Sequence, residues 1–135
     1  MSAARATVQS WLDALAHQEG ITDLRLDERG LLGLQTDSGL QIELEVPAES
    51  GLLYLRAGLG ELPAQDRESV LTQLMSFNFL LDQAGGATFA LDAERQQLAL
   101  SVCQGLGHLD AIDFANLLQG FIAAAVDWQD KIRRL

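Results

Sequence analysis

Two histidines, one cysteine and several paired glycines and carboxylates are the residues of this 135-residue chain that could do chemistry. His17 and His108 stand far apart, and neither belongs to a metal-binding pattern such as HExxH. Cys103 is the only cysteine, which excludes an intrachain disulfide and a multi-cysteine metal site. We therefore expect no catalytic residue, no metal and no cofactor at these positions.

The glycine and carboxylate pairs also favour structure over catalysis. Gly58 and Gly60, like a second pair at positions 105 and 107, lack the third glycine or the Gly-Lys-Ser/Thr of a phosphate-binding loop. Glu43 and Glu45 lie two positions apart, which is typical of the solvated face of a strand rather than of an acid/base pair. This inventory predicts a binding domain and not an enzyme.

The charge balance narrows the class of partner. Nine Lys and Arg against 19 Asp and Glu give a formal net charge of −10 and a pI of about 4.4. A chain this acidic repels phosphate backbones and anionic lipid, so nucleic acid and membrane surfaces are poor partners. At roughly 100–200 residues per domain, we expect one acidic, cytoplasmic domain over residues 1–135.

The elements that would position these residues follow from hydrophobic periodicity. Helical spacing predicts a first helix that ends at Gly20, and alternation of period two predicts strands in the segments after it. Short connections with turn residues make the strands antiparallel. The expected fold is α+β, with the elements helix, antiparallel strands, helix, β-hairpin and helix at residues 3–18, 22–27, 31–36, 40–46, 52–59, 63–82, 89–102 and 110–134.

The second predicted helix is apolar around most of its circumference, so it needs cover from more than one side. One small domain has few layers, and a second copy of the chain is the economical source of that cover. The sequence thus predicts a homodimer, with an interface that includes Leu74, Phe77, Asn78 and Leu81.

Over about residues 8–133 the chain resembles the class I type III secretion chaperones, the Tir-chaperone (CesT-like) family. The resemblance rests on the order of four segments: Leu24 to Asp27, Leu74 to Asn78, Gly86 to Glu94 and Asp110 to Trp128. It implies a secretion-chaperone-like α/β sandwich that is homodimeric in the bacterial cytoplasm. It also implies binding of the N-terminal region of a secreted effector, without enzymatic activity.

A chaperone that does not hydrolyse ATP must bind its client with a static surface. The first helix and the strands offer more apolar residues than one small core needs, so we expect shallow grooves rimmed by Asp13, Glu43 and Glu45. These grooves would hold an extended segment of the partner. The residues expected to bind it are Trp11, Leu12, Leu15, Leu32, Leu34 and Leu55.

Other functions stay open at this stage. A regulator that sequesters another chaperone or a transcriptional regulator would use the same surface. An immunity-type inhibitor would use its acidic face to block a toxin, and a small ligand-binding or hydrolytic domain would need clustered polar groups.

Overall fold

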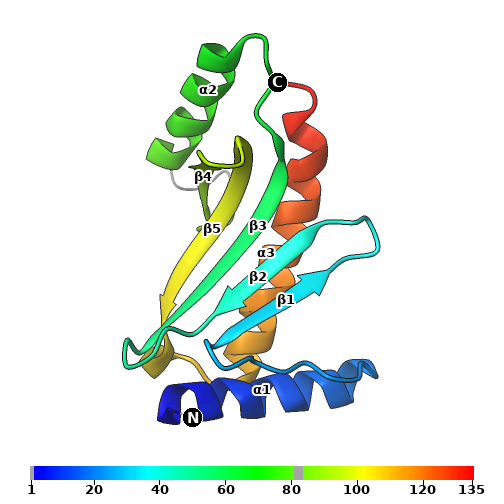
Figure 1. Ribbon diagram of the computed structural model, residues 1–135, viewed down its shortest axis with the longest axis vertical. Helices are drawn as coiled ribbons and strands as arrows, with labels where there is room; N and C mark the ends of the chain where they lie inside the picture. The colour runs from blue at the N-terminus through cyan, green and yellow to red at the C-terminus, as the bar shows by residue number, and fades with distance from the viewer. Residues whose placement is uncertain (1, 81–83) are drawn as a thin grey trace.

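The computed structural model describes residues 2–80 and 84–135, and it has three α-helices and a five-stranded sheet within these ranges (Figure 1). The elements are α1 Ala3–Glu19, β1 Leu31–Gln35, β2 Gln41–Glu45, β3 Leu52–Glu61, α2 Arg67–Leu80, β4 Thr88–Asp92, β5 Gln97–Gly105, a 3-10 turn Leu106–His108 and α3 Ala111–Ile132. The α+β class and the order of these elements confirm the prediction.

The sheet is antiparallel throughout, with the strand order β1-β2-β3-β5-β4. Alternation of buried and exposed residues along β2 and β3 gives the sheet one apolar and one polar face. Leu44 and Leu55 are paired across these strands and are fully buried on the apolar face. The register of β3 against β5 shifts between Gly58 and Gly60, and Gly60 has a φ of 127° that suits a glycine.

Helix α3 runs along one face of the sheet, and α1 lies across one end of it (Figure 1). Helical spacing places Phe114, Leu118, Phe121, Ala125 and Trp128 on one side of α3, and all five are buried. The capping box between Asp110 and Asp113 fixes where this helix begins. Helix α1 ends at Gly20 with a left-handed φ of 67°, also as predicted. Both helices bury the apolar stripe that their sequence spacing places on one side.

The predicted strand at 22–27 does not form. Leu24 and Leu26 are buried as their alternation requires, but this segment is not a strand. The Gln9 side chain of α1 donates to the Leu24 carbonyl at 2.8 Å and accepts from the Leu26 N–H at 2.9 Å. A side chain thus supplies the hydrogen bonds that a neighbouring strand would supply, so Leu24 and Leu26 are buried although the segment does not join the sheet.

Helix α2 begins at Arg67, four residues after the predicted start at Pro63. Asp66 has a φ of 57°, which is incompatible with the right-handed helix, so the regular turns begin only after it. The helix lies beside β4, at the end of the molecule opposite α1 (Figure 1). Part of its contact with the rest of the chain is an aromatic cluster, in which the Phe77 ring centroid lies 6.1 Å from that of Phe89 and 5.4 Å from that of Trp128.

Candidate protein-binding site

Most of the predicted partner-binding residues belong to the core. Leu12 and Leu55 have no exposed surface, and Leu15 and Leu32 are 6 % and 9 % exposed. A partner cannot contact fully buried side chains, so the prediction is wrong for Leu12 and Leu55. Leu15 and Leu32 keep only a small accessible surface. The physical reason is that α1 and α3 pack over the sheet and bury these side chains in one core. Trp11 and Leu34 are half-buried and keep accessible surface.

An apolar groove is nevertheless present beside α1. The groove of about 350 Å³ lies between α1 and the first turns of α3. Trp11 and Leu15 line it from α1, and Ile112 lines it from α3 with 71 % of its surface exposed. The Trp11 ring packs on Phe114 at 5.5 Å between centroids, which fixes the wall of the groove. Two residues that were predicted to bind a partner, Trp11 and Leu15, therefore share this groove with Ile112, which was not among the predicted residues.

Carboxylates surround this groove. Glu19, at the end of α1, accepts a hydrogen bond from Gln119 of the groove lining at 3.4 Å. Asp110 and Asp113 flank Ile112 in the first turn of α3. The groove therefore combines an apolar floor with negatively charged surroundings, and this combination suits a partner segment that carries both apolar and basic side chains.

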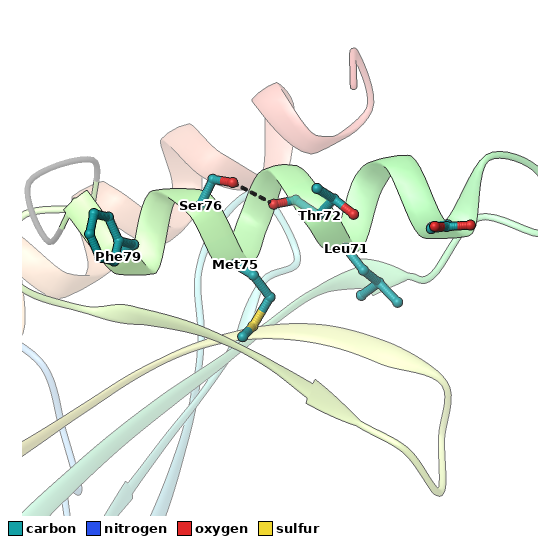
Figure 2. A pocket seen from close by; sticks show the side chains of 6 residues that line it. Leu71, Thr72, Met75, Ser76 and Phe79 are labelled. Atoms are coloured by element: carbon teal, nitrogen blue, oxygen red, sulfur yellow. Dashed lines mark hydrogen bonds between the residues drawn. The ribbon is translucent and has the colours of Figure 1, made fainter.

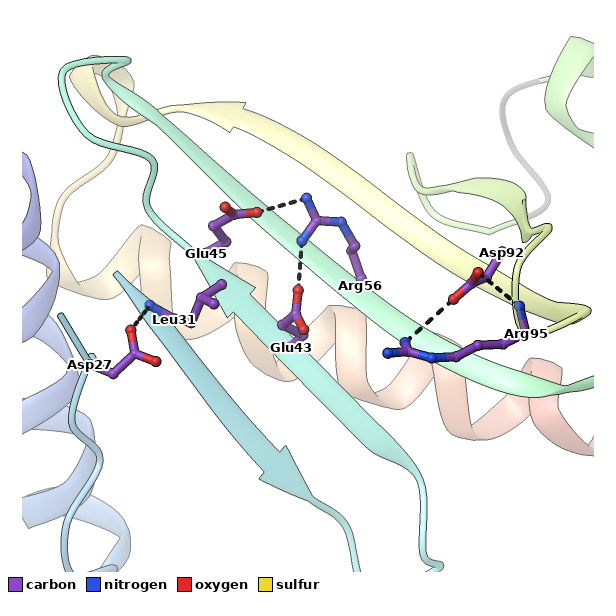
Figure 3. Close-up of polar contacts among 7 residues, drawn as sticks. All are labelled: Asp27, Leu31, Glu43, Glu45, Arg56, Asp92 and Arg95. Atoms are coloured by element: carbon purple, nitrogen blue, oxygen red, sulfur yellow. Dashed lines mark hydrogen bonds and ion pairs between the residues drawn. The ribbon is translucent and has the colours of Figure 1, made fainter. Parts of the chain in front are cut away.

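The predicted acidic rim at Glu43 and Glu45 has a different role. Both carboxylates accept hydrogen bonds from Arg56 at 2.8 Å, across β2 and β3 on the outer face of the sheet (Figure 3). Burial lowers the pKa of Arg56, but the hydrogen bonds and charges of Glu45 and Glu43 outweigh it and raise the pKa above its ordinary value. This guanidinium is permanently charged and neutralises part of the acidic face.

The predicted dimer residues of α2 point into their own protomer. Leu74 is 3 % exposed and lies in the core, Phe77 belongs to the aromatic cluster, and Asn78 hydrogen-bonds to the backbone of Phe89. Leu81 lies outside the described residues. Leu74, Phe77 and Asn78 therefore fasten α2 to its own sheet instead of offering a free interface.

The exposed apolar face of α2 is the adjacent stripe of the same helix. Met75 is 67 % exposed and Phe79 is 85 % exposed, and with Leu71 they line a hollow of about 690 Å³ (Figure 2). Glu68, Thr72 and Ser76 complete its lining. The sequence had shown that this helix is apolar over most of its circumference, but the spacing alone did not indicate which stripe is covered by the protomer.

The residues considered for chemistry lie apart. Within residues 2–80 and 84–135, no group of three or more His, Cys, Asp or Glu residues could hold a metal ion. Cys103 is exposed on β5, and His108 belongs to the 3-10 turn before α3. Over the same ranges, no helix is both long enough and apolar enough to cross a membrane. What the surface does offer is two apolar faces, one between α1 and α3 and one on α2.

A helix-and-sheet domain with apolar faces of this kind belongs to the class of protein-binding domains. Comparison with protein families gives a match to the Tir chaperone protein (CesT) family over residues 10–129. The chain belongs to this family of chaperones. A comparison with curated proteins finds no match.

Solved structures show the same fold. A chain of the ExsC-ExsE complex is 24 % identical with a TM-score of 0.81, and the match covers 96 % of each chain. A chain of the HopA1-SchA chaperone-effector complex is 16 % identical with a TM-score of 0.77, covering 100 % of this chain and 99 % of that one. The match to the Yersinia pestis type III secretion chaperone SycH in complex with a YscM2 fragment has 20 % identity and a TM-score of 0.66, covering 88 % and 97 %.

Proposed function

We propose that this chaperone binds the N-terminal region of a type III secreted effector in the bacterial cytoplasm and keeps it soluble and ready for export. The observation that carries the proposal is the family match, which extends over residues 10–129 of 135. Support comes from the HopA1-SchA complex, a chaperone bound to an effector, whose fold this chain shares. The chaperone acts by binding alone, without catalysis.

The groove between α1 and α3 is the proposed contact for apolar side chains of the effector. Ile112 is a large apolar member of its lining that is 71 % exposed, so covering it would contribute hydrophobic free energy to binding. The surrounding carboxylates Glu19, Asp110 and Asp113 favour an effector segment with basic residues next to its apolar anchors. Trp11 supplies a rigid aromatic wall, which is the type of residue that dominates binding energy at interfaces.

The outer edge of β1 is the proposed site where an effector strand adds to the sheet. The Val46 N–H donates to the Gly30 carbonyl, and the Thr36 N–H donates to the Leu40 carbonyl. The backbone N–H and C=O groups of the even-numbered residues of β1 therefore point toward β2. The alternation of an antiparallel ladder then turns the N–H and C=O of Gly33 and Gln35 outward. An extended segment of a partner can pair with these outward groups.

We further propose that two copies of the chain associate through the exposed stripe of α2. Leu71, Met75 and Phe79 form an apolar face on one helix, and a twofold axis would bury the same face of both copies against each other. This proposal keeps the predicted homodimer and moves its interface by one stripe, from Leu74 and Phe77 to Met75 and Phe79.

Affinity purification from the native bacterium, with partners identified by mass spectrometry, tests the function. We expect one secreted protein to be recovered, and its N-terminal fragment alone to bind the purified chaperone. Recovery of a transcriptional regulator or of a second chaperone would instead favour the sequestration role. Recovery of a toxin that the protein inhibits would favour the immunity-type role.

Matched variants of α3 test the groove. Ile112→Glu places a charge on its floor, whereas Val126→Glu adds the same charge to an exposed position of the same helix outside the groove. We expect Ile112→Glu to weaken binding of the effector fragment at least tenfold, which corresponds to roughly 1.4 kcal/mol, and Val126→Glu to leave it unchanged. Equal affinities of the two variants would refute the groove as the contact.

A further inference from the structure

The two outer strands of the sheet differ in how their free edges are closed. An edge strand presents a row of unpaired N–H and C=O groups, which is a template for pairing with another chain. In this protein the edges belong to β1 and β4. What covers each edge therefore decides where a foreign strand, or a second copy of the sheet, can add.

Asn78 covers the edge of β4. Its Oδ1 accepts from the Phe89 N–H at 2.7 Å, and its Nδ2 donates to the Phe89 carbonyl at 2.9 Å. One carboxamide thus makes the pair of hydrogen bonds that a residue of a neighbouring strand would make. Both bonds are partly buried, so water competes with them less than at an open edge.

This one side chain occupies the backbone groups of one of the two residues of β4 whose N–H and C=O point outward. Because Asn78 binds the backbone of Phe89, the N–H and C=O of Phe89 point away from β5. Alternation along the strand then makes Leu91 the other residue of Thr88–Asp92 whose N–H and C=O point outward. With Phe89 occupied, Leu91 alone remains, and a single outward residue cannot hold a strand in register. The same contact holds α2 against the sheet, so the helix itself stands over this edge (Figure 1).

The edge of β1 is closed only at its beginning. The Asp27 carboxylate accepts from the Leu31 N–H at 3.0 Å, and the Leu31 carbonyl accepts from the Asp27 N–H at 2.8 Å (Figure 3). The next outward residues, Gly33 and Gln35, follow in sequence and give a partner two consecutive residues to pair with. The two edges are therefore unequal.

We propose that Asn78 is an edge lock, a positioning residue that closes β4 to strand addition. The inference concerns the chaperone alone and does not depend on which protein it binds. Loss of the lock opens β4, so copies of the chain associate edge to edge into species larger than those of the wild type.

Asn78→Ala tests the lock, with Gln73→Ala as the matched control: Gln73 is a half-buried amide of the same helix whose side chain hydrogen-bonds within α2, to Ser69. Amide hydrogen exchange reports on the Phe89 N–H, which we expect to exchange roughly tenfold faster in Asn78→Ala, as for the loss of one hydrogen bond of about 1.4 kcal/mol. Light scattering after size-exclusion chromatography measures assembly. We expect Asn78→Ala to form larger species and Gln73→Ala to match the wild type.

A second substitution separates an open edge from simple destabilisation. The N–H of Leu91 faces outward, so Leu91→Pro removes an edge donor without removing a hydrogen bond to β5. We expect Asn78→Ala/Leu91→Pro to return to the size of the wild type. If Asn78→Ala does not fold, Asn78→Asp, which keeps the acceptor and loses the donor, takes its place in both measurements. Wild-type size of the single variant, or no rescue by Leu91→Pro, would overturn the proposal.

Discussion

Two adjacent residues of α2 should respond to substitution in opposite ways. Leu74 is 3 % exposed and belongs to the protomer core, whereas Met75 is 67 % exposed and lines the hollow on the outer face. Truncation of Leu74 should therefore lower the free energy of unfolding. A charge at Met75 should instead weaken association of two copies and leave the fold of each copy intact.

The magnitudes follow from burial. Leu74→Ala removes buried methyl groups and leaves a cavity, which costs about 2–5 kcal/mol of unfolding free energy. Full burial of a Met side chain is worth about 1.5–3 kcal/mol, and two thirds of Met75 is still exposed, so each copy can gain about 1–2 kcal/mol on association. A twofold interface counts this gain twice. Met75→Glu should thus raise the dimer Kd by roughly 30- to 700-fold.

Sedimentation velocity over a concentration series measures the Kd, and urea unfolding at one fixed concentration measures stability. Because a dimer gains stability from association, urea unfolding of the variants is compared at a concentration where both are monomeric. Gln73→Glu, which adds the same charge outside the hollow, is the control. A Met75→Glu variant that keeps the Kd of the wild type would refute the assignment of the interface to this stripe.

Three further predictions follow from single features. The hydrogen bond from the Leu31 N–H holds the pKa of Asp27 below its ordinary value, so its stabilising effect is present above about pH 4 and is lost as the pH falls through the lowered pKa. In urea titrations, the free energies of unfolding of wild type and Asp27→Asn should differ at pH 7, and this difference should shrink as the pH falls below about 4. Gln9→Ala leaves the buried backbone of Leu24 and Leu26 without partners, and calorimetry should show a loss of roughly 2–4 kcal/mol. Stopped-flow association with a basic effector fragment should slow as salt rises, because screening weakens attraction to a chain of net charge −10.

The fold was predictable from the sequence wherever one face of an element is buried and the other is exposed to solvent. The alternation in β2 and the stripe of α3 fall into this category, and both elements form where the sequence indicates. The segment 22–27 has the same alternation, but strand formation also needs a neighbouring backbone, and here Gln9 takes that place. Periodicity reports burial of alternate residues and carries no information on what supplies the hydrogen bonds.

The candidate interface on α2 shows a second limit of sequence reasoning. The apolar residues Leu74 and Met75 are adjacent, and hydrophobicity does not separate the one that packs on the protomer from the one left exposed. The distinction comes from Asn78 and Phe77, whose contacts with Phe89 set the rotation of the helix about its axis. The available signal was an asparagine between two phenylalanines, Phe77 and Phe79, since a carboxamide in apolar surroundings needs a partner with both a donor and an acceptor.

The groove beside α1 was predicted from an apparent surplus of apolar residues, and that premise does not hold for Leu12 and Leu55, which the core uses completely. Binding surface arises instead where two elements meet without filling the space between them, as α1 and α3 do at Ile112. Its signal in the sequence is an apolar residue off the buried stripe: Ile112 precedes Phe114, which begins the inner face of α3, and lies beside carboxylates. An apolar side chain in that position has no use in the protomer core, and this distinguishes candidates for partner binding better than the number of leucines does.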